Sequence, residues 1–281
     1  MRSELRRGFT LIEVIITITL LGIVAAVVMV FIRAPVQGYV DQARRAALTD
    51  VADGAVRRIA RDLHQALPNS VRIINGDALE FMPVRLIGRY RAAFGTDGMT
   101  GSGHPLDFIG LTPPLDGTFD ILGAPIQFQS TDEIVIYNLG PGVVDDAGHA
   151  VADAFAAAPN NRRHYNGVSD TPLNTVSTAV TTQPFPFDSP THRFHVVDTP
   201  VTYSCKGGVL RRYWGYPIAA LQSDPPVGGI TALLADQQVR CAFTYAPGIT
   251  ARLGLVSILL SITQDGEAVS LYQEIHVSNT P

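Results

Sequence analysis

One carboxylate lies in a stretch of the sequence that is otherwise uncharged. From Phe9 to Ile32 the chain runs for 24 residues, and Glu13 is the sole ionisable side chain among them. A carboxylate inside an apolar helix that enters a membrane costs a few kcal/mol, so such residues usually serve a function. Two interpretations of Glu13 stay open. It reaches headgroup water from a position near the membrane interface, or it pairs with a positive charge.

The two cysteines, Cys205 and Cys241, lie far beyond this apolar stretch, on the side of the membrane that would be exported. An even number of cysteines in an oxidising compartment indicates a disulfide. We therefore expect Cys205 and Cys241 to be bonded to each other. The alternative is a pair of buried thiols.

The other polar residues form no recognisable catalytic or metal-binding pattern. His192 and His195 lie three positions apart on an expected strand, so their side chains would point to opposite faces. Asp145 and Asp146 are adjacent acids in a glycine-rich loop, where such residues are normally solvated and only in some cases contact calcium. We expect no enzymatic activity, no cofactor and no metal site. The net charge of −4, with Lys206 as the one lysine, also gives no basic face for nucleic acid.

The first 67 residues predict one long helix. Residues 9–32 span about 36 Å as a helix, enough to cross the hydrocarbon core of a bilayer once. Residues 33–67 continue it as an amphipathic segment, because apolar side chains recur every three or four positions. Those residues are Val36, Val40, Ala43, Ala47, Val51, Ala55, Ile59, Leu63 and Leu67. Pro68-Asn69 is the expected stop.

Residues 68–281 read as a β-rich domain. Asn75-Gly76 and Asp265-Gly266 each separate two strand-like runs and predict hairpin turns. Further expected strands are Glu133 to Leu139, Phe194 to Cys205, Val209 to Trp214 and Gln238 to Tyr245. The fold class is therefore α+β: an antiparallel sheet half covered by the long helix.

Two long stretches between these strands, Arg85 to Ser130 and Gly140 to Pro190, are rich in Gly, Pro, Asp, Asn and Thr. This composition predicts irregular surface insertions. If the chain has a binding function of its own, we expect these loops to carry it.

The segment Arg7-Gly8-Phe9-Thr10-Leu11-Ile12-Glu13-Val14 resembles the prepilin peptidase motif of type IV pilins and type II secretion pseudopilins. The resemblance implies that residues 1–8 are a leader, that prepilin peptidase cleaves after Gly8 on the cytoplasmic side, and that Phe9 is then N-methylated. It also implies a role for Glu13. The new ammonium group of Phe9 would lie about 6 Å along a helix from Glu13, so the charges can pair within a subunit or between subunits.

Two further segments, Phe194 to Tyr216 and Leu63 to Arg72, are similar to the MshO group, the minor prepilins of the mannose-sensitive haemagglutinin (MSHA) pilus. More broadly the chain resembles the J-type minor pseudopilins. These resemblances imply a pilin-like fold and a low-copy subunit that helps to start filament assembly at or near the tip.

Three functions stay open on this basis: a minor pilin of a type IV pilus, a minor pseudopilin of type II secretion, and a pilus-tip adhesin. The expected partners are prepilin peptidase, other minor and major pilins, the inner-membrane assembly platform and the lipid bilayer. The expected location is the inner membrane, crossed once, with residues 68–281 in the periplasm and, after assembly, at the filament tip.

Overall fold

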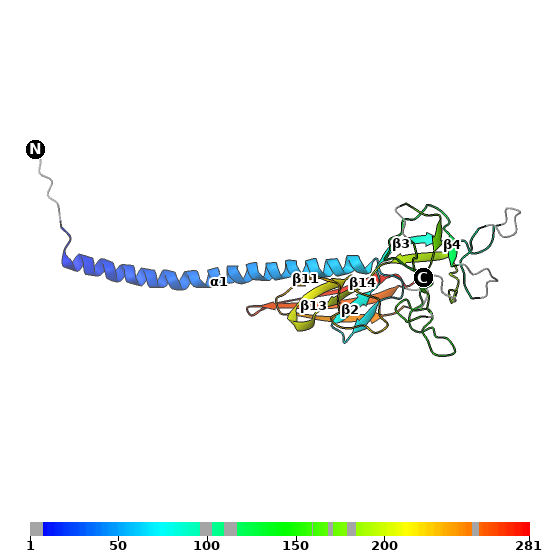
Figure 1. The fold of residues 1–281 in the computed structure, drawn as a ribbon. Coiled ribbons are helices and arrows are strands. Elements are labelled where there is room, and N and C mark those ends of the chain that lie inside the picture. The colour runs from blue at the N-terminus through cyan, green and yellow to red at the C-terminus, as the bar shows by residue number, and fades with distance from the viewer. Residues whose placement is uncertain are drawn as a thin grey trace, which may run out of the picture. The chain divides into compact units, whose positions relative to one another are not determined.

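The computed structural model describes residues 8–95, 103–109, 117–158, 160–167, 171–178, 184–248 and 253–281, so residues 1–7 of the expected leader lie outside the described part. The chain divides into two compact units, Met1–Thr49 and Asp50–Pro281. One helix, α1 (Leu11–Leu63), contributes residues to both units, and β-strands follow it in the second (Figure 1). The expected α+β class, a long N-terminal helix followed by antiparallel sheets, is confirmed.

Helix α1 ends at Leu63, four residues before the expected end at Leu67. The reason is a change of hydrogen-bond partner. The backbone N–H of Leu67 donates to the carbonyl oxygen of Met82 at 2.7 Å, and the N–H of Val84 donates to the carbonyl of Gln65 at 2.7 Å. These backbone groups pair with the chain that enters the β-sheets, so they are not used to continue the helix.

In the second unit, one face of α1 is buried. The buried side chains are Ala52, Ala55, Val56, Ile59 and Leu63. They recur at the three- and four-residue steps of a helix that packs one stripe against a core. The apolar face predicted for this part of the helix is confirmed.

Asp62 fixes the end of this helix to the sheet. Its carboxylate accepts hydrogen bonds from Arg212 Nε at 2.7 Å and from the hydroxyl of Tyr203 at 2.8 Å, and Arg58 Nε lies 3.2 Å from its other oxygen. A carboxylate at a helix C-terminus is disfavoured by the helix dipole, and the two guanidinium groups offset that effect. The sequence pattern places Asp62 on the polar face, but its side chain is only 16% exposed.

The first sheet holds the predicted hairpin at Asn75-Gly76. Its strands, in spatial order, are β1 (Arg72–Ile74), β2 (Ala78–Phe81), β9 (Val201–Ser204), β10 (Leu210–Trp214) and β11 (Ile230–Ala235). Asn75 and Gly76 both have positive φ angles, 49° and 81°. That combination is typical of a type I′ turn, and the antiparallel pairing of β1 with β2 confirms the hairpin.

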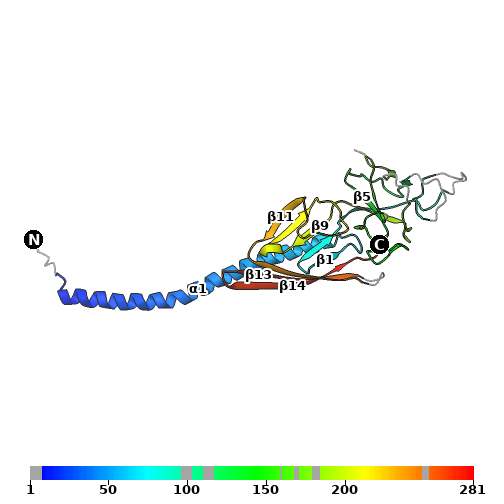
Figure 2. The ribbon, with the colours of Figure 1, turned by 60° about the horizontal axis from the view of Figure 1, so that its bottom comes forward.

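The second sheet contains the C-terminal hairpin (Figure 2). Its order is β12 (Val239–Ala246), β13 (Gly254–Gln264) and β14 (Glu267–Val277). Near the end of β14, Ile275 and Val277 are buried whereas Glu274 and His276 are exposed. This alternation agrees with the one predicted from the sequence.

The two stretches expected as surface insertions are more ordered than predicted. They contribute strands to a four-stranded sheet and form a two-stranded one. The four-stranded sheet has the order β3 (Val84–Arg89), β8 (Arg193–Val197), β5 (Glu133–Ile136) and β6 (Arg162–His164). The two-stranded sheet pairs β4 (Thr118–Asp120) with β7 (Thr175–Ser177). They also build an apolar core that includes Tyr90, Leu106, Phe119, Phe128, Tyr165, Val176 and Phe185. Surface insertions are therefore the wrong description of much of these stretches.

The expected single strand from Phe194 to Cys205 is also divided. β8 ends at Val197 and β9 begins at Val201, and the two belong to different sheets. Pro200 lies in the break, where its lack of an N–H removes a donor that a continuous strand would use. The chain passes here from the four-stranded to the five-stranded sheet.

A disulfide joins two of the sheets. Cys205 directly follows β9 and Cys241 lies on β12, and the structure bonds their sulfur atoms, with 5.8 Å between the Cα atoms. The pairing expected from the sequence is present. It ties the five-stranded sheet to the C-terminal sheet across 36 positions of sequence.

Reduction of this disulfide should lower the free energy of unfolding by roughly 4 kcal/mol, the chain-entropy value for a closed loop of this length. The measurement is urea unfolding of the full-length chain in detergent, with and without reductant, followed by the fluorescence of Trp214. As a control, the reductant should change nothing in the double variant Cys205→Ser, Cys241→Ser. Equal stability of the oxidised and reduced wild-type chain would contradict this expectation.

Candidate functional site

The backbone around the expected cleavage point is accessible. Gly8, Phe9 and Thr10 are exposed and lie outside regular secondary structure, and α1 begins at Leu11. A Cβ atom placed on Gly8 would meet no other atom within 4 Å. The fold of the chain therefore does not itself require a glycine at this position.

Thr10 sets the start of the helix. Its hydroxyl oxygen accepts a hydrogen bond from the N–H of Glu13 at 3.4 Å, and its carbonyl accepts from the N–H groups of Glu13 and Val14 at 3.1 and 3.3 Å. Thr10 and Glu13 have the spacing of a capping box, in which a threonine begins a helix and a glutamate follows three positions later. The sequence Thr10-Leu-Ile-Glu13 carries this signal within the same segment that resembles the peptidase motif.

Glu13 lies in the first turn of α1, and its side chain is exposed. A negative charge there interacts favourably with the positive end of the helix dipole. The expected separation of about 6 Å from the amine of Phe9 assumed a helix that begins at Phe9. That assumption is wrong for the described chain, because Phe9 and Thr10 precede the helix.

The segment from Leu11 to Ile32 has the properties of a membrane span. It is about 33 Å long as a helix, and its side chains are exposed in the isolated chain. Its hydroxyl groups are satisfied internally. Thr17 Oγ1 donates to the carbonyl of Glu13 at 2.9 Å, and Thr19 Oγ1 donates to that of Ile15 at 2.9 Å. These bonds reduce the cost of placing the two hydroxyls in an apolar medium.

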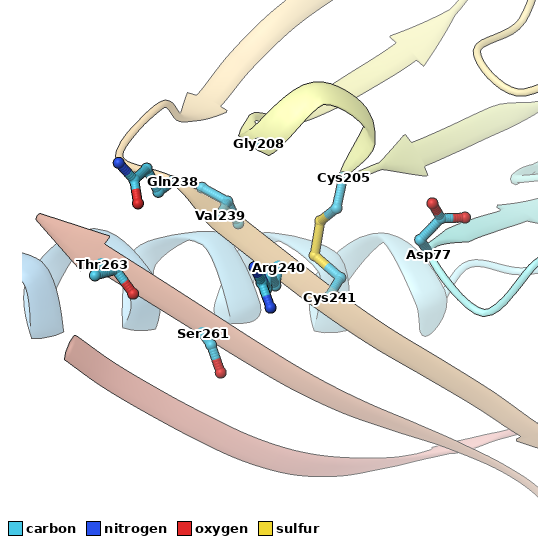
Figure 3. A pocket seen from close by; sticks show the side chains of 9 residues that line it. All are labelled: Asp77, Cys205, Gly208, Gln238, Val239, Arg240, Cys241, Ser261 and Thr263. Carbon is cyan, nitrogen blue, oxygen red and sulfur yellow. A yellow bond between two sulfur atoms is a disulfide. The ribbon is translucent and has the colours of Figure 1, made fainter.

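A cleft lies beside the disulfide in the second unit (Figure 3). It has a volume of about 890 Å³, and Asp77, Arg240, Ser261 and Thr263 are among the side chains that line it. Asp77 Oδ1 is buried there without a hydrogen-bond partner. The cysteines are thus brought together next to this cleft, whereas Gly8, Phe9 and Glu13 belong to the first unit.

Among the acids and histidines considered as metal ligands, Asp145 forms hydrogen bonds within its own loop. Asp145 Oδ1 accepts from the N–H groups of Ala147 and His149 at 3.0 and 2.8 Å, and its other oxygen lies 3.0 Å from His149 Nδ1. These hydrogen bonds lower the pKa of Asp145. Burial, followed by the charge of Arg193, lowers the pKa of His195 to about 4. Within the described ranges, no three His, Cys, Asp or Glu side chains are grouped as a metal site.

Comparison with known proteins identifies the N-terminal segment. A family model described as the prokaryotic N-terminal methylation motif matches residues 5–29. No curated protein and no solved structure matches the chain. The matched residues include the junction at Gly8 and most of the apolar segment, and the motif implies a processing peptidase and pilin partners in general. Together with the apolar helix, it fits a membrane-anchored protein that crosses once. The motif supports a type IV prepilin-like protein, and proteins with this motif are typically structural.

Proposed function

We propose that this chain is a minor pilin of a type IV pilus of the MSHA kind, processed between Gly8 and Phe9, and that it helps to start filament assembly at or near the tip. The observation that carries the proposal is the methylation motif at the start of an exposed apolar helix that leads into a β-rich unit. The similarity of residues 63–72 and 194–216 to minor prepilins of that pilus supports the specific system. The β-rich unit would lie in the periplasm before assembly.

Cleavage after Gly8 changes the forces on the helix. The leader contains Arg2, Arg6 and Arg7, and these charges would hold the N-terminus at the cytoplasmic surface. Their removal leaves one ammonium group, on Phe9, as the positive charge at the N-terminal end of the apolar segment. A helix with a single N-terminal charge can leave the bilayer for a bundle of other helices at a lower cost than one with three arginines.

Glu13 then provides the partner for an ammonium group. If Phe9 and Thr10 joined the helix to pair with Glu13 of the same chain, the cap that Thr10 makes on the N–H of Glu13 would be lost. Pairing with the Phe9 amine of a neighbouring subunit leaves that cap in place. We therefore favour a contact between subunits, in which each charge removes the penalty of burying the other.

The variant Gly8→Val should leave the full-length precursor in the inner membrane, because the side chain obstructs the peptidase at the scissile bond. The structure offers a matched control in Gly22→Val, since a Cβ atom at Gly22 also meets nothing within 4 Å. Gly22→Val should be processed like the wild type. The readout is the ratio of precursor to mature chain on immunoblots of membranes. Normal processing of Gly8→Val would refute the assigned cleavage site.

Variants of Glu13 separate its charge from its effect on the helix start. Glu13→Leu should be inserted and cleaved but should enter assembly complexes poorly, and Glu13→Asp should keep part of the activity. Glu13→Gln keeps the capping-box spacing without the charge, because glutamine also serves at this position of the box. It should therefore behave like Glu13→Leu.

The measurement is co-purification of each variant with the other minor subunits from membranes, together with a count of surface filaments. Normal recovery and piliation for Glu13→Gln would assign Glu13 to helix capping and refute the ion pair.

Deletion of the gene should remove surface filaments and leave export of hydrolases intact. Loss of export with intact filaments would instead identify a pseudopilin of type II secretion.

A further inference from the structure

A groove with an aliphatic floor lies beside strand β3 in the second unit. The N–H of Leu122 donates a hydrogen bond to the carbonyl of Arg89 at 2.8 Å and so holds the segment Ile121–Ile126 beside β3. This segment forms the other wall of the groove. The groove has a volume of about 280 Å³. Its lining consists of Ile87, Gly88, Arg89, Ile121, Leu122, Ala124, Pro125, Ile126 and Arg193.

Two arginines meet at this groove. Arg89 on β3 and Arg193 on β8 are directly opposite each other in the antiparallel register, and both are exposed. Like charges at directly opposite positions of a sheet destabilise it. Neither arginine has a carboxylate partner among the residues that the structure describes. The pair is therefore an uncompensated positive site within the described unit.

Two described carboxylates of this part of the fold, Asp120 and Asp188, already have partners. Asp120 accepts from Arg91 Nε at 2.9 Å and from the backbone N–H of His104 at 3.0 Å. Asp188 accepts a hydrogen bond from the hydroxyl of Tyr90. An anion from outside the chain would find both guanidinium groups available.

The side chains that line the groove favour a peptide carboxylate over an acidic sugar. Ile87 is 59% exposed and Leu122 is 43% exposed, so the floor of the groove presents aliphatic surface to solvent. The nine lining residues include no aromatic, amide or hydroxyl side chain. Sugars are usually held by such groups, whereas aliphatic side chains of a peptide bury favourably on this floor. The guanidinium geometry of arginine is suited to a carboxylate.

We propose that this groove binds a short acidic and aliphatic peptide segment of a partner protein. A glutamate or aspartate carboxylate lies between Arg89 and Arg193, and a neighbouring aliphatic side chain packs on Ile87 and Leu122. The site goes beyond filament assembly and does not depend on it, since it belongs to the β-rich unit alone. It would give this unit a recognition function of its own.

The test uses the full-length chain in detergent and two fluorescent peptides, acetyl-Gly-Leu-Glu-Val-Gly-amide and the same peptide with Gln in place of Glu. The Glu peptide should bind at least tenfold more tightly by fluorescence anisotropy. Arg89→Gln and Arg193→Gln should each weaken it about tenfold. Arg240→Gln is the matched control, because Arg240 is an exposed strand arginine whose cross-strand neighbour is Ser261, and it should bind like the wild type.

Equal binding of the two peptides, absence of saturable binding, or an equal loss in Arg240→Gln would overturn the proposal. Binding of an oligogalacturonate in place of the Glu peptide would also overturn it and assign the groove to an acidic glycan.

A second readout is thermal unfolding at low ionic strength. Arg89→Gln should raise the unfolding midpoint, because it relieves repulsion between the arginines. A lowered midpoint would show that Arg89 serves the fold, and would contradict a site for an external anion.

Discussion

The apolar surface of α1 between Leu11 and Ile32 has no cover within the chain's first unit, and the proposed role in a membrane and in a filament depends on how it is covered. Burial of apolar surface is worth roughly 25 cal/mol per Å², so a segment of this length cannot remain in water. Lipid and other helices of the same kind are the two available covers. A chain that moves from lipid into a bundle of other helices needs an N-terminus that is held at the membrane before processing and released after it.

The start of α1 meets that need with few residues. Thr10 begins the helix, so the Gly8–Phe9 bond lies just ahead of it, exposed and outside regular secondary structure. Glu13 lies in the first turn, where the helix dipole tolerates a negative charge. In the proposed filament, the same carboxylate would pair with the amine of a neighbouring chain. Under the proposed function, processing, helix start and subunit contact would all depend on Gly8, Phe9, Thr10 and Glu13.

Sequence patterns predicted the local features well and the non-local ones poorly. The apolar helix, the turns at Asn75-Gly76 and Asp265-Gly266, and the cysteine pair all depend on short spacings or on compartment. The core around Phe119 and Tyr165 escaped prediction because its residues come from short strands far apart in the sequence. Strand composition gave no sign of it, since Gly, Pro and Asn between those strands resemble loop sequence.

The opposition of Arg89 and Arg193 was likewise invisible in the sequence. Their 104-residue separation is closed only by the register of β3 with β8. Asp62 shows the same limit, because its position in a helical pattern indicated solvent, whereas Arg212 and Tyr203 from distant strands enclose it. Contacts of this kind depend on sheet order, which single-sequence patterns do not determine.

The most direct test of the account is the mass of the N-terminal peptide of the chain, measured separately from sheared surface filaments and from membranes. If the chain is processed as proposed, the surface pool begins at N-methylated Phe9, with Glu13 as the fifth residue of the mature chain. A surface pool that retains Met1, or a mature chain that lacks the apolar segment, would contradict it.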